Sequence, residues 1–90
     1  EAGPSELELA ASCNPFSEMV TITAVADPLP RQLAVYDLSG RLIRSLGNGR
    51  NEGVFLWDGS DASGEEVPPG TYLIRAASAG RLASLRLVKL

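Results

Sequence analysis

The chain has 90 residues, with 11 acidic against 8 basic side chains, a formal net charge of −3 and no histidine. This length fits one domain with a modest core, and the acidic balance argues against a nucleic-acid binder. Without histidine, Ser-His-Asp and Cys-His catalytic arrangements and histidine-ligated metal sites are excluded.

The sequence opens EAGPSE, which has the composition of a linker. We therefore interpret residues 1–5 as the remnant of a linker and residues 6–90 as a domain cut from a longer protein. The lone Cys13 has no partner for an internal disulfide, so we interpret it as a small, partly buried apolar residue. No apolar run approaches the about 18 residues of a membrane span, so we expect no direct membrane insertion.

Short runs of alternating apolar and polar residues recur along the chain, and no segment has the apolar spacing of an amphipathic helix. In the first run Leu7 and Leu9 share a face, and in the second Val20 and Ile22 do. This alternation is typical of half-buried strands.

A hairpin is predicted between the third and fourth runs, 32–37 and 41–46. The three-residue loop 38–40 between them ends in Gly40, for which we expect a left-handed conformation that a side chain disfavours. A polar, glycine-rich loop, 47–53, follows.

The fifth run carries Phe55 and Trp57 on one face, and the loop 78–80 joins the last two runs. The predicted strands are 6–12, 19–26, 32–37, 41–46, 54–58, 71–77 and 81–90. Seven short strands with regular turns match the immunoglobulin-like antiparallel β-sandwich, so we predict an all-β fold. The expected core comprises Leu9, Val20, Ile22, Leu33, Val35, Leu56 or its neighbours, Trp57, Leu73 and Leu85.

The stretch 57–72, WDGSDASGEEVPPGTY, holds the densest set of candidate functional groups. Its four carboxylates lie in a turn-rich loop without the burial that would shift their pKa values for acid–base work, so we expect no enzyme activity. Two interpretations of the loop stay open. The oxygens around Asp58 and Asp61 suit an irregular Ca²⁺ site, although the spacing is not that of an EF-hand. Alternatively, Asp58-Gly59 and Ser63-Gly64 are turn pairs bonded to the local backbone, and we expect no cofactor.

Three aromatic residues, Tyr36, Trp57 and Tyr72, are candidates for a sugar-stacking platform if they share an exposed face. A lone tryptophan in a small sandwich more often lies at the centre of the core, because it buries a large apolar area.

The charged residues are unevenly distributed. Residues 58–66 include four acids and no bases, whereas residues 75–89 include three Arg and one Lys and no acids. The C-terminal strand is therefore predicted to be locally basic.

Taken together, several short pieces resemble the C-terminal sorting domain of proteins exported by the Por (type IX) secretion system, and the related immunoglobulin-like domain of flagellar hook-capping proteins. The pieces are Cys13-Asn14-Pro15-Phe16, Val35-Tyr36-Asp37-Leu38-Ser39-Gly40-Arg41, Trp57-Asp58-Gly59 with Asp61 and Gly64, Pro69-Gly70-Thr71-Tyr72 and Arg86-Leu87-Val88-Lys89-Leu90. The resemblance covers residues 5–90.

The resemblance implies a non-catalytic sorting and cell-surface attachment domain of a larger exported bacterial protein. Its partners would be the outer-membrane secretion and attachment machinery and a covalently linked upstream cargo, and its route would lead through the periplasm to the cell surface or medium. The implied sorting-motif residues are Asn14, Pro15, Gly70, Tyr72, Arg86, Lys89 and Leu90. We expect the last strand to be an edge strand that a partner recognises through its unpaired backbone groups, with Arg86 and Lys89 supplying charge.

Two alternatives of other classes remain. A structural scaffold or adhesion module of the hook-cap type would self-associate through an exposed sheet edge. A carbohydrate-binding accessory module would expose Trp57 and Tyr72 on one surface.

Overall fold

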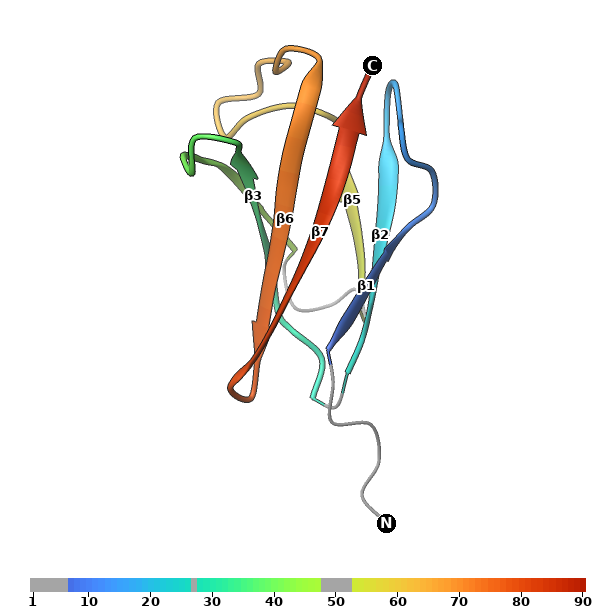
Figure 1. Ribbon diagram of the computed structural model, residues 1–90, viewed down its shortest axis with the longest axis vertical. Helices are drawn as coiled ribbons and strands as arrows, with labels where there is room; N and C mark the ends of the chain where they lie inside the picture. Colours follow the sequence, from blue (N-terminus) through green and yellow to red (C-terminus); the bar gives the residue numbers. More distant parts are fainter. Residues whose placement is uncertain (1–6, 27, 48–52) are drawn as a thin grey trace.

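The computed structural model describes residues 7–26, 28–47 and 53–90. These residues form seven strands and no helix, arranged as two antiparallel sheets that pack face to face (Figure 1). The strands are β1 Glu8–Ala11, β2 Val20–Val25, β3 Leu33–Asp37, β4 Leu42–Leu46, β5 Val54–Trp57, β6 Gly70–Ser78 and β7 Arg81–Lys89. The predicted all-β, immunoglobulin-like sandwich is therefore confirmed, and all seven strands lie where the alternation places them.

One sheet has the strand order β1-β2-β5 and the other β4-β3-β6-β7. Two hairpins, β3–β4 and β6–β7, stay within the four-stranded sheet, and the chain crosses between the sheets before β3, before β5 and before β6. Since the described residues include no helix, none in this part of the chain is long and apolar enough to cross a membrane. The predicted linker 1–5 and most of the predicted loop 47–53 lie outside the described residues.

The core lies between the sheets and is built from the inward-facing residues of the strands. The predicted core residues Val20, Ile22, Leu33, Val35 and Trp57 are buried, and Leu9 and Leu85 pack against the core while partly exposed. Phe55, a neighbour of Leu56 covered by the prediction, is also buried. The sequence did not single out the following buried residues as core: Leu7, Phe16, Ala24, Ile43, Leu46, Val67, Tyr72, Ile74, Ala76 and Leu87.

The register of the strands decides between Leu56 and its neighbours in favour of the neighbours, and it corrects the predicted core position Leu73. Leu56 is 57% exposed while its neighbour Trp57 points inward, and Leu73 is only half-buried because Ile74 takes the inward position of β6. β5 is apolar on both faces, so alternation alone does not select its inward face. In β6, Leu73 lies on the outward face together with Thr71 and Arg75. Cys13, expected to be partly buried, is exposed.

The β3–β4 hairpin has the predicted turn, with Gly40 at a φ of 91°. The Asp37 carboxylate closes this turn by accepting hydrogen bonds from the backbone N–H groups of Ser39 and Arg41 at 2.9 and 3.0 Å. Between β6 and β7, Ser78 pairs with Arg81. The two-residue turn is therefore made by Ala79 and Gly80, both at positive φ.

Candidate functional site

The side chain of Asn14 links the connection between β1 and β2 to the end of β7. Its Nδ2 donates to the carbonyl of Arg86 at 2.7 Å, and its Oδ1 accepts from the N–H of Val88 at 2.9 Å. A side-chain amide that both donates and accepts in this way satisfies the outward backbone groups as a neighbouring strand would.

Phe16 continues this pairing with its backbone. Its N–H donates to the carbonyl of Val88 at 2.9 Å, and its own carbonyl accepts from the N–H of Leu90 at 2.8 Å. Phe16 thereby forms a parallel bridge with Lys89. The prediction of unpaired backbone groups along the last strand is thus wrong for 86–90, where the segment 14–16 occupies the edge.

Three buried aromatic rings lie beneath this pairing. The Phe16 and Trp57 ring centroids are 5.4 Å apart, and Tyr72 meets Trp57 edge-on at 5.5 Å. Trp57 donates its indole N–H to the carbonyl of Ser60, and the Tyr72 hydroxyl donates to the carbonyl of Pro68 at 2.5 Å. Burial raises the pKa of the Tyr72 hydroxyl above its usual value. Because Trp57 and Tyr72 are both buried, the core interpretation of Trp57 is confirmed, and the two rings do not form the exposed face that the sugar-stacking alternative requires.

Lys89 is 3% exposed, so its ammonium group lies inside the domain. The Nζ atom donates to Oε2 of Glu66 at 2.9 Å. Gly59 lies against its aliphatic stem so closely that a Cβ there would be 2.6 Å from Cε of Lys89. The prediction that Lys89 presents its charge to a partner is therefore wrong, since its charge is turned inward and neutralised by Glu66.

The sequence-derived motif residues thus fall into one cluster. Gly70 pairs with Lys89 and Tyr72 with Leu87 across β6 and β7, and Asn14 and Pro15 lie at the outer edge of the same strand. Only Arg86 and Leu90 in the terminal piece direct exposed side chains to solvent. Glu66 and Gly59 were not singled out as parts of this site, because their role depends on contact with a residue more than twenty positions away in sequence.

The loop between β5 and β6 is a set of closed turns. Oδ1 of Asp58 accepts from the N–H and hydroxyl of Ser60, and Oδ1 of Asp61 accepts from the N–H and hydroxyl of Ser63. These hydroxyl hydrogen bonds are the main reason that the pKa values of both aspartates lie below their usual range. The geometry is that of the turn-pair interpretation.

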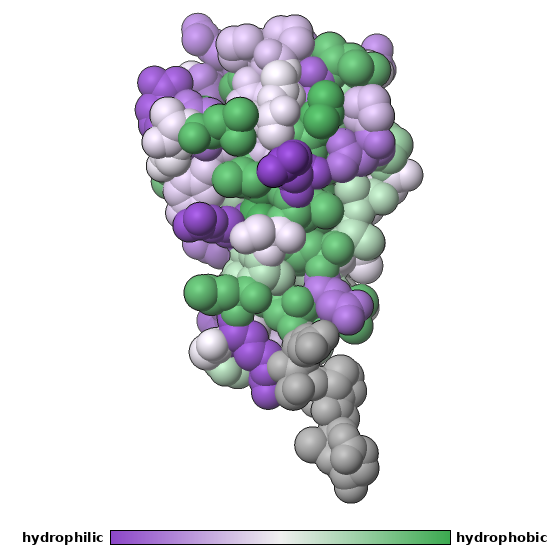
Figure 2. All heavy atoms as spheres, in the orientation of Figure 1, coloured by the Kyte–Doolittle hydropathy of each residue, from purple (hydrophilic) through white to green (hydrophobic). Residues whose placement is uncertain are grey.

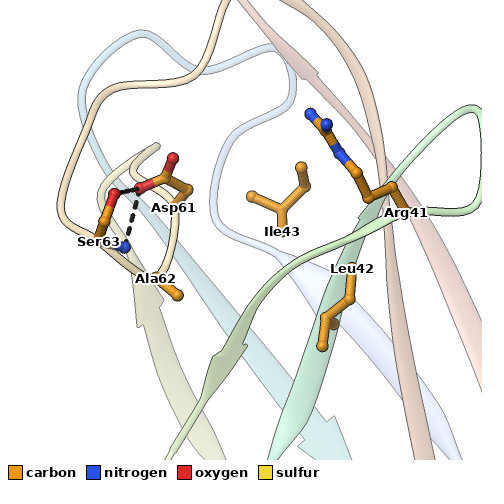
Figure 3. Close-up of a pocket in the computed structure, with 6 residues that line it drawn as sticks. All are labelled: Arg41, Leu42, Ile43, Asp61, Ala62 and Ser63. Atoms are coloured by element: carbon orange, nitrogen blue, oxygen red, sulfur yellow. Dashed lines mark hydrogen bonds between the residues drawn. The ribbon is translucent and has the colours of Figure 1, made fainter.

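A surface pocket of about 340 Å³ lies between β4 and this loop (Figure 3). Arg41 and Asp61 lie on either side of Ile43, and Oδ1 of Asp61 is already bonded to Ser63. Within residues 7–26, 28–47 and 53–90, no three His, Cys, Asp or Glu side chains converge as metal ligands.

Two solved structures from Porphyromonas gingivalis share this fold. One is of PorZ, described as an essential bacterial surface component of the type-IX secretion system, with a TM-score of 0.73 and 18% identity over 91% of this chain. The other is of dimeric latent PorU, with a TM-score of 0.69 and 22% identity over 99% of this chain. The matched regions are 11% and 10% of those chains, so this chain corresponds to a small part of each.

No curated protein matches the sequence. A known domain family does: residues 7–81 match the FlgD Ig-like domain, which covers β1 to β6 and the start of β7. The match includes Asn14, the β3–β4 hairpin and the turns between β5 and β6, whereas the residues that Asn14 contacts, Arg86 and Val88, lie beyond it. The chain therefore belongs to the FlgD Ig-like domain family.

Proposed function

We propose that this domain is a non-catalytic sorting and attachment module at the C-terminal end of a larger exported bacterial protein. It directs a covalently linked upstream cargo through the periplasm to the cell surface or medium, and its partners are the outer-membrane secretion and attachment machinery. The likeness in fold to part of PorZ, a surface component of a type-IX secretion system, supports this proposal.

The observation that carries the proposal is the convergence of three sequence pieces at one end of the sandwich. Asn14 and Pro15, the start of β6 at Gly70, and the last residues of β7 are far apart in sequence but adjacent in the fold. The β6–β7 hairpin by itself brings Gly70 and Lys89 together, whereas the contact between Asn14 and the end of β7 is an addition that the hairpin does not require.

In this proposal the recognised element is a folded surface rather than a flexible tail. Asn14 and Phe16 hold the end of β7 in place, and the buried Lys89 anchors it to Glu66. The exposed side chains of Arg86 and Leu90 are then presented in a fixed position. Fixing a recognition element in advance lowers the entropic cost of binding.

A reporter fusion in a bacterium with a type IX secretion system tests the proposal. Residues 1–90 fused behind the reporter should send it to the surface or medium, and the double variant Arg86→Glu/Leu90→Ser should leave it in the periplasm. Both changed side chains are exposed, so the domain should stay folded, as circular dichroism can verify. Lys89→Glu is unsuitable, because it would bury a carboxylate beside Glu66.

The matched control is Arg31→Glu/Leu82→Ser, which makes the same chemical changes at two exposed positions outside the cluster. Export of the control together with retention of the test variant supports the proposal. Equal export of both variants would show that the end of β7 is not part of a sorting signal.

A second candidate is a structural scaffold, which the family match itself favours. The edge strand β5 carries the exposed apolar side chains of Val54 and Leu56, a surface suited to self-association. Sedimentation of the purified domain distinguishes the two: a concentration-dependent dimer that Leu56→Lys abolishes would favour the scaffold.

We further propose that the domain works without a cofactor. The carboxylates of Asp58 and Asp61 are already engaged by their own turns, so added Ca²⁺ should not change the melting temperature. A rise of several degrees that EDTA reverses would contradict this, because a ligand that binds only the folded state stabilises it.

A further inference from the structure

We propose that the outer face of the four-stranded sheet docks an acidic, partly apolar segment of a partner protein. The surface is defined by a row of side chains across the sheet, together with Arg75. Cross-strand pairing aligns Leu42 with Tyr36, Tyr36 with Leu73 and Leu73 with Arg86. Paired residues project to the same side of a sheet, so these four form one continuous row, here called the Tyr36 row.

The charge on this face is opposite in sign to that of the whole chain. Arg75 and Arg86 are both exposed, and neither forms an ion pair with a carboxylate in the described part of the chain. No Asp or Glu occupies an outward position of β3, β6 or β7. A basic face on a chain of net charge −3 selects an acidic partner by charge complementarity.

Arg75 is held in position on this face. Its guanidinium carbon lies 5.5 Å from the centre of the Tyr36 ring, within the range of a cation–π interaction. A guanidinium fixed in this way loses less freedom when it binds a carboxylate, and its fork matches the two carboxylate oxygens.

The rest of the row is apolar. Leu42 is exposed and Leu73 half-buried, so the row offers contact area between the charges. Figure 2 shows the side on which β6 and β7 lie in front beside β1 and β2, and hydrophobic surface there is interrupted by strongly hydrophilic groups. This mixture suits a segment in which carboxylates alternate with apolar side chains.

Other occupants fit less well. A symmetric pair of copies joined through this face would bring the two exposed arginines of one copy against those of the other, and like charges repel. A sugar ring would stack on Tyr36, but Arg75 already lies over that ring. The inference rests on the proposed function only in assigning Arg86 to a recognition surface.

A binding experiment with the purified domain tests the inference without any export step. The probe is a displayed library of random peptides of about 10 residues, which extend over roughly 33 Å and so exceed the width of four strands. Selected peptides are synthesised and titrated by fluorescence anisotropy. We expect them to be enriched in Asp and Glu together with apolar residues. Their Kd should rise at least about tenfold in Arg75→Glu, with binding weakened as the salt concentration increases.

The control variant Arg31→Glu changes the net charge by the same amount in the connection before β3 and should leave Kd unchanged. When a selected peptide is titrated into the domain, the largest changes in backbone amide NMR chemical shift should occur at the residues of the Tyr36 row. Selected peptides without acidic residues, equal loss in the two variants, or no selected peptide at all would each overturn the inference. Failure of the reporter export with intact peptide binding would count against the proposed function and not against this surface.

Discussion

The two halves of β7 differ, although they belong to one continuous strand. In the half nearest the C-terminus, Leu87 is fully buried, Lys89 is buried, and the outward backbone groups of Val88 are hydrogen-bonded to Asn14 and Phe16. In the half that follows the β6–β7 turn, Leu82 is 82% exposed, and in the described part of the chain the outward edge beside Ser84 has no such partner. One half is held on both edges and the other on one.

This difference shows that an edge strand need not be an open edge. A short segment from elsewhere in the chain covers the part that carries the motif residues, and it leaves the turn-proximal part uncovered. The covered half gains rigidity, while the uncovered half keeps the free edge that favours fraying or strand addition.

The largest effect is expected from truncating the same residue type in the two halves. Leu87→Ala should lower the free energy of unfolding by about 2–5 kcal/mol, because it leaves a cavity in the core. Leu82→Ala should change it by less than about 0.5 kcal/mol, because its side chain is exposed. Chemical denaturation measures both, and equal losses would contradict the contrast between the halves.

Removing the Asn14 side chain should leave the two outward backbone groups that it bonds without that partner, so that this part of the covered half resembles the uncovered half. Asn14→Ala deletes the hydrogen bonds to Arg86 and Val88 and should cost about 1–3 kcal/mol. Amide hydrogen exchange at Val88 should accelerate. The comparison variant Ser84→Ala, on the uncovered half, should alter neither the free energy of unfolding nor the exchange rate of Val88. An unchanged exchange rate in Asn14→Ala would show that the Asn14 hydrogen bonds do not stabilise the end of β7.

The free energy of unfolding should fall more when Glu66 is removed than when the buried charge of Lys89 is removed. Glu66→Ala leaves the Lys89 ammonium buried without a carboxylate and should cost about 1–2 kcal/mol. Lys89→Met keeps the aliphatic stem and leaves Glu66 in water, so its cost should be smaller. Denaturation of the two variants side by side measures the order, and the reverse order would mean that the ion pair itself is the stabilising feature.

The smallest effect should come from the turn that begins the uncovered half. Ala79 has a φ of 53°, which a non-glycine residue rarely adopts and asparagine tolerates better. Ala79→Asn should therefore raise the free energy of unfolding by about 0.5 kcal/mol. Ala77→Asn, in the strand before the turn, serves as a control that should not stabilise. A loss of stability in Ala79→Asn would mean that the turn is not limited by its backbone conformation.

Local sequence was enough to predict the strands and several turns. The alternation of Val20 and Ile22 reported the inward face of β2 because only one face of that strand is apolar, and Gly40 marked its turn because few residues accept a positive φ. The motif pieces named the residues of the candidate site. They did not reveal that Lys89 points inward.

Tertiary structure decided the features that depend on residues distant in sequence. Leu56 points outward because β5 pairs with β2 in a register that places Phe55 and Trp57 inside. Asn14 closes the end of β7 across more than seventy residues, a contact that no local pattern encodes. The sequence by itself determined where strands form, because backbone and side-chain preferences act over a few residues. Which edges close and which charges are buried depends on the three-dimensional arrangement, because hydrogen bonds and burial act between residues that only the fold brings together.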